Sequence, residues 1–177
     1  WLTLPRSSRW SAPRFEYISR DSAPIRTEPG VEARVYSGSS GAARAQTHNY
    51  VPVTLIDVRL QPGARFEQEL PDSYNGFIYV LDGDVSVGDR NTSVAGGQVG
   101  WLAAADAGSS QNSSLSFVAG DEGARVLLYA GERQGVPIVQ HGPFVGESRN
   151  DIVRLSQVYM SGKMPRISEL TPSASVR

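Results

Sequence analysis

The chain has 177 residues and an ordinary globular composition, with 40% hydrophobic residues, 20% charged residues and a formal net charge of −1. This small charge excludes a bulk basic field for direct binding to nucleic acid or to an anionic membrane surface. The chain contains no cysteine, which excludes disulfides, thiolate metal sites and cysteine nucleophiles. No apolar run approaches the roughly 20 residues that are needed to span a bilayer.

Residues 1–30 are expected to form an irregular N-terminal arm, because prolines at positions 5, 13, 24 and 29 interrupt any long element. The chain begins at Trp1 and not at a methionine, which favours a native polypeptide that was processed or that extends further upstream. With no secretory signal in view, we expect an intracellular protein, and the cytoplasm, the nucleus and an organelle all remain open.

From Val31 onward, short apolar runs are separated by Gly, Pro or Asp at intervals of roughly ten residues, which is typical of an all-β sandwich or barrel. Residues 81–85 (LDGDV) carry a tight-turn signal between two of these runs. The expected strands are residues 31–36, 51–60, 64–70, 76–81, 85–87, 99–103, 114–119 and 125–129.

One α-helix is predicted over residues 148–161. Ser148 is a suitable N-cap with Asp151 three residues later, and Gly162 can end the helix. Residues 165–177 contain two prolines and several serines and are expected to be a tail. The apolar positions that repeat at helical spacing are Ile152, Leu155 and Tyr159.

Three stretches of the chain resemble the pirin family of the cupin superfamily. Residues 62–64 (PGA) together with 77–85 (FIYVLDGDV) resemble the first conserved block of its C-terminal cupin, and residues 137–145 (PIVQHGPFV) resemble its C-terminal signature. Residues 1–5 (WLTLP) resemble the segment that joins the two cupins of the family. The resemblance implies a cupin jelly-roll barrel over residues 31–146, followed by the helix and tail of residues 147–177.

The same resemblance implies where a metal would be bound. Pirins are similar to two cupins placed back to back, with an iron-type metal held by histidines and a glutamate in the N-terminal barrel. Some members of the family oxidise quercetin, and others act as nuclear cofactors of transcription regulators. In this chain, Gly63 and Gly83 occur at the interval of the two glycines in the first cupin motif. Three ligand positions then fall on Glu69, Pro71 and Gly76, and the second motif, with residues 95–97 (AGG) at its corner, puts the fourth at Gly100.

Of these four positions, only Glu69 has a side chain that can ligate a metal, and one carboxylate does not hold a transition metal against water. We therefore expect no metal, no cofactor and no catalytic residue in this chain, which favours a protein that is not itself an enzyme. If the emptied positions leave a void, a small molecule could bind there. The residues of such a pocket would be Glu69, Ile78, Val80 and Gly100.

A second hypothesis concerns protein partners. Phe77 and Tyr79 share one face of their expected strand, opposite Ile78 and Val80, so one pair can fill the barrel while the other faces a partner. His141 is interpreted as a residue that fixes a turn, although a histidine can also act as an acid or base. The candidate interface residues are Trp1, Trp10, Phe15, Phe77, Tyr79, His141 and Phe144.

These observations favour a non-catalytic pirin-like cupin that acts as a protein-binding or structural module, for instance as a subunit of a larger assembly. Its expected partners are other protein chains or an upstream cupin domain. The alternative is the C-terminal half of a two-cupin, metal-dependent dioxygenase of the quercetin type, whose metal-bearing N-terminal half is absent from this chain.

Overall fold

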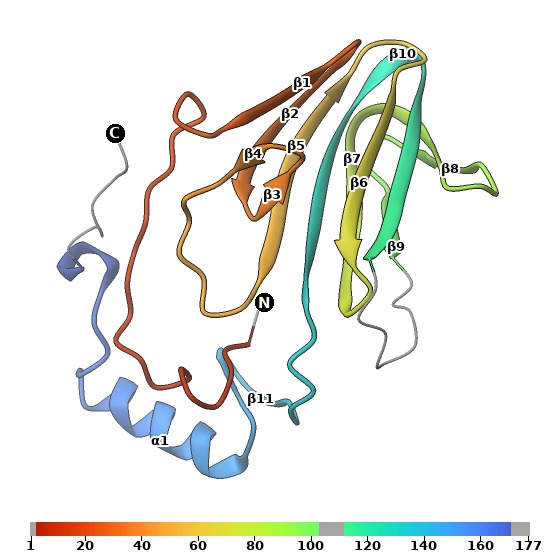
Figure 1. Ribbon diagram of the computed structural model, residues 1–177. Helices are drawn as coiled ribbons and strands as arrows, with labels where there is room; N and C mark the ends of the chain where they lie inside the picture. Colours follow the sequence, from red (N-terminus) through yellow and green to blue (C-terminus); the bar gives the residue numbers. More distant parts are fainter. Residues whose placement is uncertain (1–2, 103–111, 171–177) are drawn as a thin grey trace. The chain divides into compact units, whose positions relative to one another are not determined.

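The computed structural model describes residues 3–102 and 112–170, which fall into two compact units (Figure 1). The described residues 18–102 and 112–133 form the first, which we call the sheet unit. The described residues 3–17 and 134–170 form the second, which we call the helix unit.

The sheet unit is built on one eight-stranded sheet in the order β1-β2-β5-β10-β7-β8, in which β6 also pairs with β10 and β9 with β7 (Figure 1). All of these pairings are antiparallel, and β3 and β4 form a separate two-stranded sheet. The strands are β1 Ile25–Glu28, β2 Val31–Ser37, β3 Ser39–Ser40, β4 Ala43–Arg44, β5 Val53–Leu60, β6 Arg65–Pro71, β7 Tyr74–Val87, β8 Thr92–Ala95, β9 Val99–Leu102 and β10 Asn112–Glu132.

The expected tight turn at residues 81–85 is wrong, because β7 runs through it without a break. Gly83 has a φ of +71° and pairs with Ala124, directly after a register shift in β10 between Ala119 and Ala124. A Cβ atom at Gly83 would lie 2.0 Å from the carbonyl oxygen of Gly123, so only glycine fits. The Asp-Gly pair thus marks a bulge here, since a glycine-type bulge and a tight hairpin turn both place a residue at positive φ.

In the eight-stranded sheet, the strands β1 and β8 lie where none was expected. β1 falls within the segment predicted to be irregular, and pairs with β2 so that Ile25 is opposite Arg34. Pro24 and Pro29 flank this strand at the edge of the sheet, where a missing N–H disrupts no ladder. The polar strand β8 escaped prediction because only Val94 in it is buried.

The core of the sheet unit is formed by alternate residues of its strands, whose side chains point to the same face of the sheet. In β2 the buried hydrophobic residues are Val31, Ala33 and Val35, and in β6 they include Phe66, whose ring centroid lies 5.3 Å from that of Phe117. Burial of alternate apolar residues is the main stabilising term of such a sheet. The expectation of an all-β fold is confirmed.

The helix unit contains the hairpin β11 (Val139–His141) and β12 (Phe144–Gly146), the helix α1 (Arg149–Met160) and the 3₁₀ turn η1 (Ile167–Glu169). The capping box between Ser148 and Asp151 is present, so the predicted helix start is confirmed. The helix contacts β11 and β12. Ile152 is buried and Leu155 half-buried, but Tyr159 is 64% exposed. Among the described residues, no helix is long and apolar enough to cross a membrane.

Candidate functional site

The four counted ligand positions do not assemble into a metal site. Glu69 is exposed on β6, where the buried residues are its neighbours Gln68 and Leu70 together with Phe66. Because successive side chains of a strand point to opposite faces, Glu69 does not share the core face of β6. Within residues 3–102 and 112–170, no group of three or more His, Cys, Asp or Glu side chains could hold a metal ion.

The two glycines among these positions leave no void. A Cβ atom at Gly76 would lie 2.2 Å from the carbonyl oxygen of Tyr129 and 2.9 Å from the Cβ of Ala130. At Gly100 it would lie 3.1 Å from Cγ1 of Ile78. The neighbouring strand β10 therefore occupies the space in which a ligand side chain would stand at Gly76. The residues present do not fit a metal at this place, and the expectation of a void there needs correction.

The residues of the predicted small-molecule pocket therefore lie in two different places, the core and a surface cavity. Ile78 and Val80 are part of the core, with exposures of 1% and 0%, and Gly100 packs against Ile78. Glu69 instead lines a separate cavity of about 340 Å³, which we call the rim cavity. The rim cavity is lined by Gly38, Ser39, Arg44, Ala45, Thr47, Asn49, Pro52, Val53, Thr54, Glu69, Pro71 and Tyr74.

Buried polar side chains gather beside the rim cavity. Gln68 is 4% exposed and its Nε2 donates to the carbonyl oxygens of Ser39 and Glu69, at 3.2 and 2.8 Å. Ser37 is also buried; its hydroxyl donates to the carbonyl oxygen of Val53. Thr54, which lines the cavity, is 6% exposed. Sequence reasoning missed this group, because its members lie on three different strands and share no motif.

Tyr74 lines the rim cavity and is half-buried. Burial, and then the negative charge of Glu132, raise the pKa of its phenol above the usual value of about 10. The hydroxyl of Tyr74 therefore stays protonated at physiological pH and is able to donate a hydrogen bond into the cavity.

A row of aromatic side chains, in which Trp101 is exposed and Phe77 and Tyr129 are half-buried, crosses the strands β9, β7 and β10 on the face away from the core. Phe77 is opposite both Trp101 and Tyr129 in the sheet, and its ring centroid lies 5.5 and 5.6 Å from theirs. Trp101 is 78% exposed. We call Phe77, Trp101 and Tyr129 the outer aromatic row. Sequence reasoning identified Phe77 but missed Trp101, although its alternation with Gly100 and Leu102 was visible in the sequence.

The other candidate interface residues lie elsewhere. Tyr79 is half-buried beside the outer aromatic row on β7, whereas Trp10, Phe15, His141 and Phe144 belong to the helix unit. Trp1 lies outside the described residues. His141 pairs with Phe144 at the end of the β11–β12 hairpin and is exposed. The guanidinium carbon of Arg154 lies 3.8 Å from the ring centroid of Trp10, and Phe144 packs edge-on against Tyr159.

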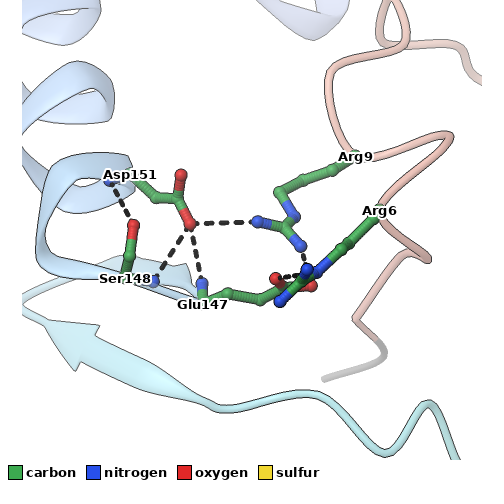
Figure 2. A network of polar contacts seen from close by, with 5 residues as sticks. All are labelled: Arg6, Arg9, Glu147, Ser148 and Asp151. Carbon is green, nitrogen blue, oxygen red and sulfur yellow. Dashed lines mark hydrogen bonds and ion pairs between the residues drawn. The ribbon is translucent and has the colours of Figure 1, made fainter.

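A polar network ties the N-terminal segment of the helix unit to the start of α1 (Figure 2). Arg9 contacts both Glu147 and Asp151, the latter at 3.0 Å, and Arg6 donates to Glu147 at 2.8 Å. One oxygen of Asp151 also accepts from the backbone N–H groups of Glu147 and Ser148, at 2.9 and 3.0 Å. Next to the network lies a cavity of about 300 Å³ with mainly apolar walls, including Leu4, Pro137, Phe144 and Leu155. This arrangement orders the segment and presents no catalytic constellation.

Comparison with known proteins places the fold. The family model of the pirin C-terminal cupin domain matches residues 55–165. Pirin-1 of Arabidopsis thaliana is 32% identical over 92% of this chain, and the match covers 56% of that protein. This chain therefore spans about half the length of the curated relatives it matches.

Two solved structures extend the comparison. The crystal structure of GK1651 from Geobacillus kaustophilus is 36% identical with a TM-score of 0.73, covering 77% of this chain and 54% of that chain. That of quercetin 2,3-dioxygenase from Acinetobacter baumannii is 25% identical with a TM-score of 0.79, covering 92% of this chain and 55% of that chain. These likenesses confirm the cupin fold. The chain belongs to the pirin family, in which it matches the C-terminal cupin domain.

Proposed function

We propose that this chain is a non-catalytic pirin-type cupin that acts as a structural and protein-binding module. The observation that carries the proposal is the packing at Gly76, where strand β10 occupies the place of a metal-ligating side chain. The interior around it is filled by apolar residues such as Phe66, Val80 and Leu128, all fully buried. A domain with such an interior is rigid and has no room for a metal inside. We therefore expect its function to depend on contacts made by its outer surface.

The partner that best fits the outer aromatic row is a second cupin domain. Exposed aromatic residues are enriched where proteins pack together and often dominate the binding energy. Close to half of Pirin-1 lies outside the region that this chain matches, so that relative carries a further stretch of comparable length. A second cupin placed against β9, β7 and β10 would cover Trp101, which is otherwise 78% exposed.

Sedimentation velocity of the 177-residue chain at micromolar concentration tests this role. We expect the chain to self-associate or to bind a hydrophobic dye through the outer aromatic row, and Trp101→Ser and Phe77→Ser to suppress both effects. Ile25→Ser is the matched control, because Ile25 is an exposed apolar residue of the same unit on β1. A monomer that binds no dye, or variants that behave like the control, would contradict the proposal.

The second candidate is that the chain forms the C-terminal half of a metal-dependent dioxygenase whose metal is held by an N-terminal half. The likeness to the Acinetobacter baumannii quercetin 2,3-dioxygenase structure favours it, since this chain covers 55% of that chain. Both candidates predict that the 177-residue chain alone carries no stoichiometric iron, copper or nickel. Elemental analysis that finds such a metal, lost again in Glu69→Ala, would contradict both; quercetin oxidation by the native polypeptide but not by this chain would favour the second.

A further inference from the structure

The rim cavity differs from the rest of the sheet unit because polar side chains line it and lie buried beside it. Elsewhere the buried residues are almost all apolar, whereas Ser37, Ser40, Thr54 and Gln68 are buried at this end of the sheet. Burying a polar group without a partner costs free energy, so such groups are normally hydrogen-bonded. Within the described part of the chain, Oε1 of Gln68 has no partner. Gln68 does not itself line the rim cavity, so the polar groups that a bound molecule can contact are those of the cavity wall.

Two opposite charges line the rim cavity without pairing with each other. Arg44 on β4 and Glu69 on β6 both contribute to its wall, and neither forms an ion pair with any residue in 3–102 or 112–170. The formal charges of these two side chains cancel, and Glu132, whose charge acts on Tyr74, is not part of the wall. A charged ligand would be attracted by one of the two side chains and repelled by the other, and it would also lose hydration on entering, so the wall favours a neutral ligand.

The remaining polar groups of the wall offer both donors and acceptors. Nδ2 of Asn49 donates to the hydroxyl of Ser37 at 2.6 Å, which leaves the amide oxygen of Asn49 as an acceptor. A phenol has an ordinary pKa of about 10 and burial raises that of Tyr74 further, so its hydroxyl is protonated at neutral pH and can donate. The guanidinium of Arg44 donates only, and the carboxylate of Glu69 accepts only.

We propose that the rim cavity binds a small, neutral, hydroxyl-rich molecule of the size of a monosaccharide. A hydroxyl group both donates and accepts, so one such molecule can satisfy Arg44 and Glu69 together without introducing charge. Two adjacent hydroxyls also match the two N–H groups of a guanidinium and the two oxygens of a carboxylate. The cavity of about 340 Å³ is at the small end of ligand pockets, which excludes a long oligosaccharide. Binding here leaves the outer aromatic row free for its own partner.

Saturation-transfer NMR on the 177-residue chain tests the proposal with glucose, galactose and mannose as neutral probes, and with glucuronate and glucosamine as charged counterparts. We expect at least one neutral sugar to bind with a Kd of roughly 1 mM, as suits so small a ligand. At low ionic strength both charged counterparts of glucose should bind more weakly than the neutral sugars. The absence of binding by every neutral sugar, or tighter binding by glucuronate or glucosamine, would overturn the proposal.

Two variants locate the site. Arg44→Ala and Glu69→Ala should each weaken binding of the neutral sugar about tenfold, because each removes hydrogen bonds that involve a charged group. Both residues are exposed, so neither change should alter the far-UV circular dichroism spectrum. Arg59→Ala and Glu122→Ala are matched controls, since both residues are exposed charges of the sheet unit that do not line the rim cavity. Equal binding by all four variants would show that the sugar binds elsewhere.

Discussion

In the sheet unit, apolar side chains from neighbouring strands interlock, and Phe66, Ile78 and Leu128 are among the many that are fully buried. In the described part of the helix unit, by contrast, Ile152 is the only buried hydrophobic residue. Several of its large apolar residues are exposed, including Met160 at 77% and Ile138 at 68%. Its two distant segments are joined by the ion pairs of Arg6 and Arg9 with Glu147 and Asp151.

The two units therefore have different sources of stability. Burial of apolar surface gives the sheet unit a core of its own, which is what an independent domain requires. Ion pairs near a protein surface contribute little each, so a unit that depends on them is weaker and more easily opened. We therefore expect the helix unit to open locally at conditions under which the sheet unit remains folded.

The largest loss of stability is expected from Phe66→Ala in the sheet unit. The ring is fully buried against Phe117, so its removal leaves a cavity and should lower the free energy of unfolding by about 3–5 kcal/mol. Urea denaturation followed by far-UV circular dichroism measures this loss. A loss below about 1 kcal/mol would mean that the core repacks freely and that the contrast between the units is overstated.

A smaller effect is expected from Ile152→Ala on α1. Ile152 is 7% exposed, and its truncation should cost about 2–3 kcal/mol. Leu155→Ala, at a half-buried position, should cost about 1 kcal/mol. Amide hydrogen exchange is the suitable measurement, because it separates α1 from the strands. Faster exchange confined to α1 would sharpen the comparison, whereas equal acceleration in β5 and β10 would show that the two units unfold together.

The smallest effect is expected from Arg9→Ala. The side chain of Arg9 is 18% exposed and that of Glu147 is 10% exposed, so the change leaves a carboxylate largely buried with one partner fewer, at a cost of about 1–2 kcal/mol. Arg6→Ala is the control: Arg6 is 75% exposed, and its removal should have almost no effect. Amide hydrogen exchange at the first turn of α1 measures the effect of each of the two variants. If the two variants exchange alike, Arg9 does not hold the N-terminal segment in place.

Much of the fold could be predicted from local pattern. The alternation in Val31–Ser37 and Arg65–Pro71 and the capping box of Ser148 and Asp151 are short-range signals, and the structure has strands and a helix there. The prediction was wrong where one local sequence signal is compatible with two different structures. Asp82 and Gly83 form a bulge in a long strand because Ala124 of β10 pairs with Gly83. That pairing joins residues far apart in the sequence.

The sequence by itself determined which residue types are available: it has no cysteine, few histidines, and glycine or proline at most of the positions where a cupin metal would need ligands. Only the tertiary structure decided what fills that space, since the distance from Gly76 to the carbonyl of Tyr129 depends on how β7 and β10 pair. It likewise brought Arg44, Glu69 and Tyr74 to one cavity and Trp101 beside Phe77. Local propensity acts over a few residues, whereas a site is made by contacts between distant strands.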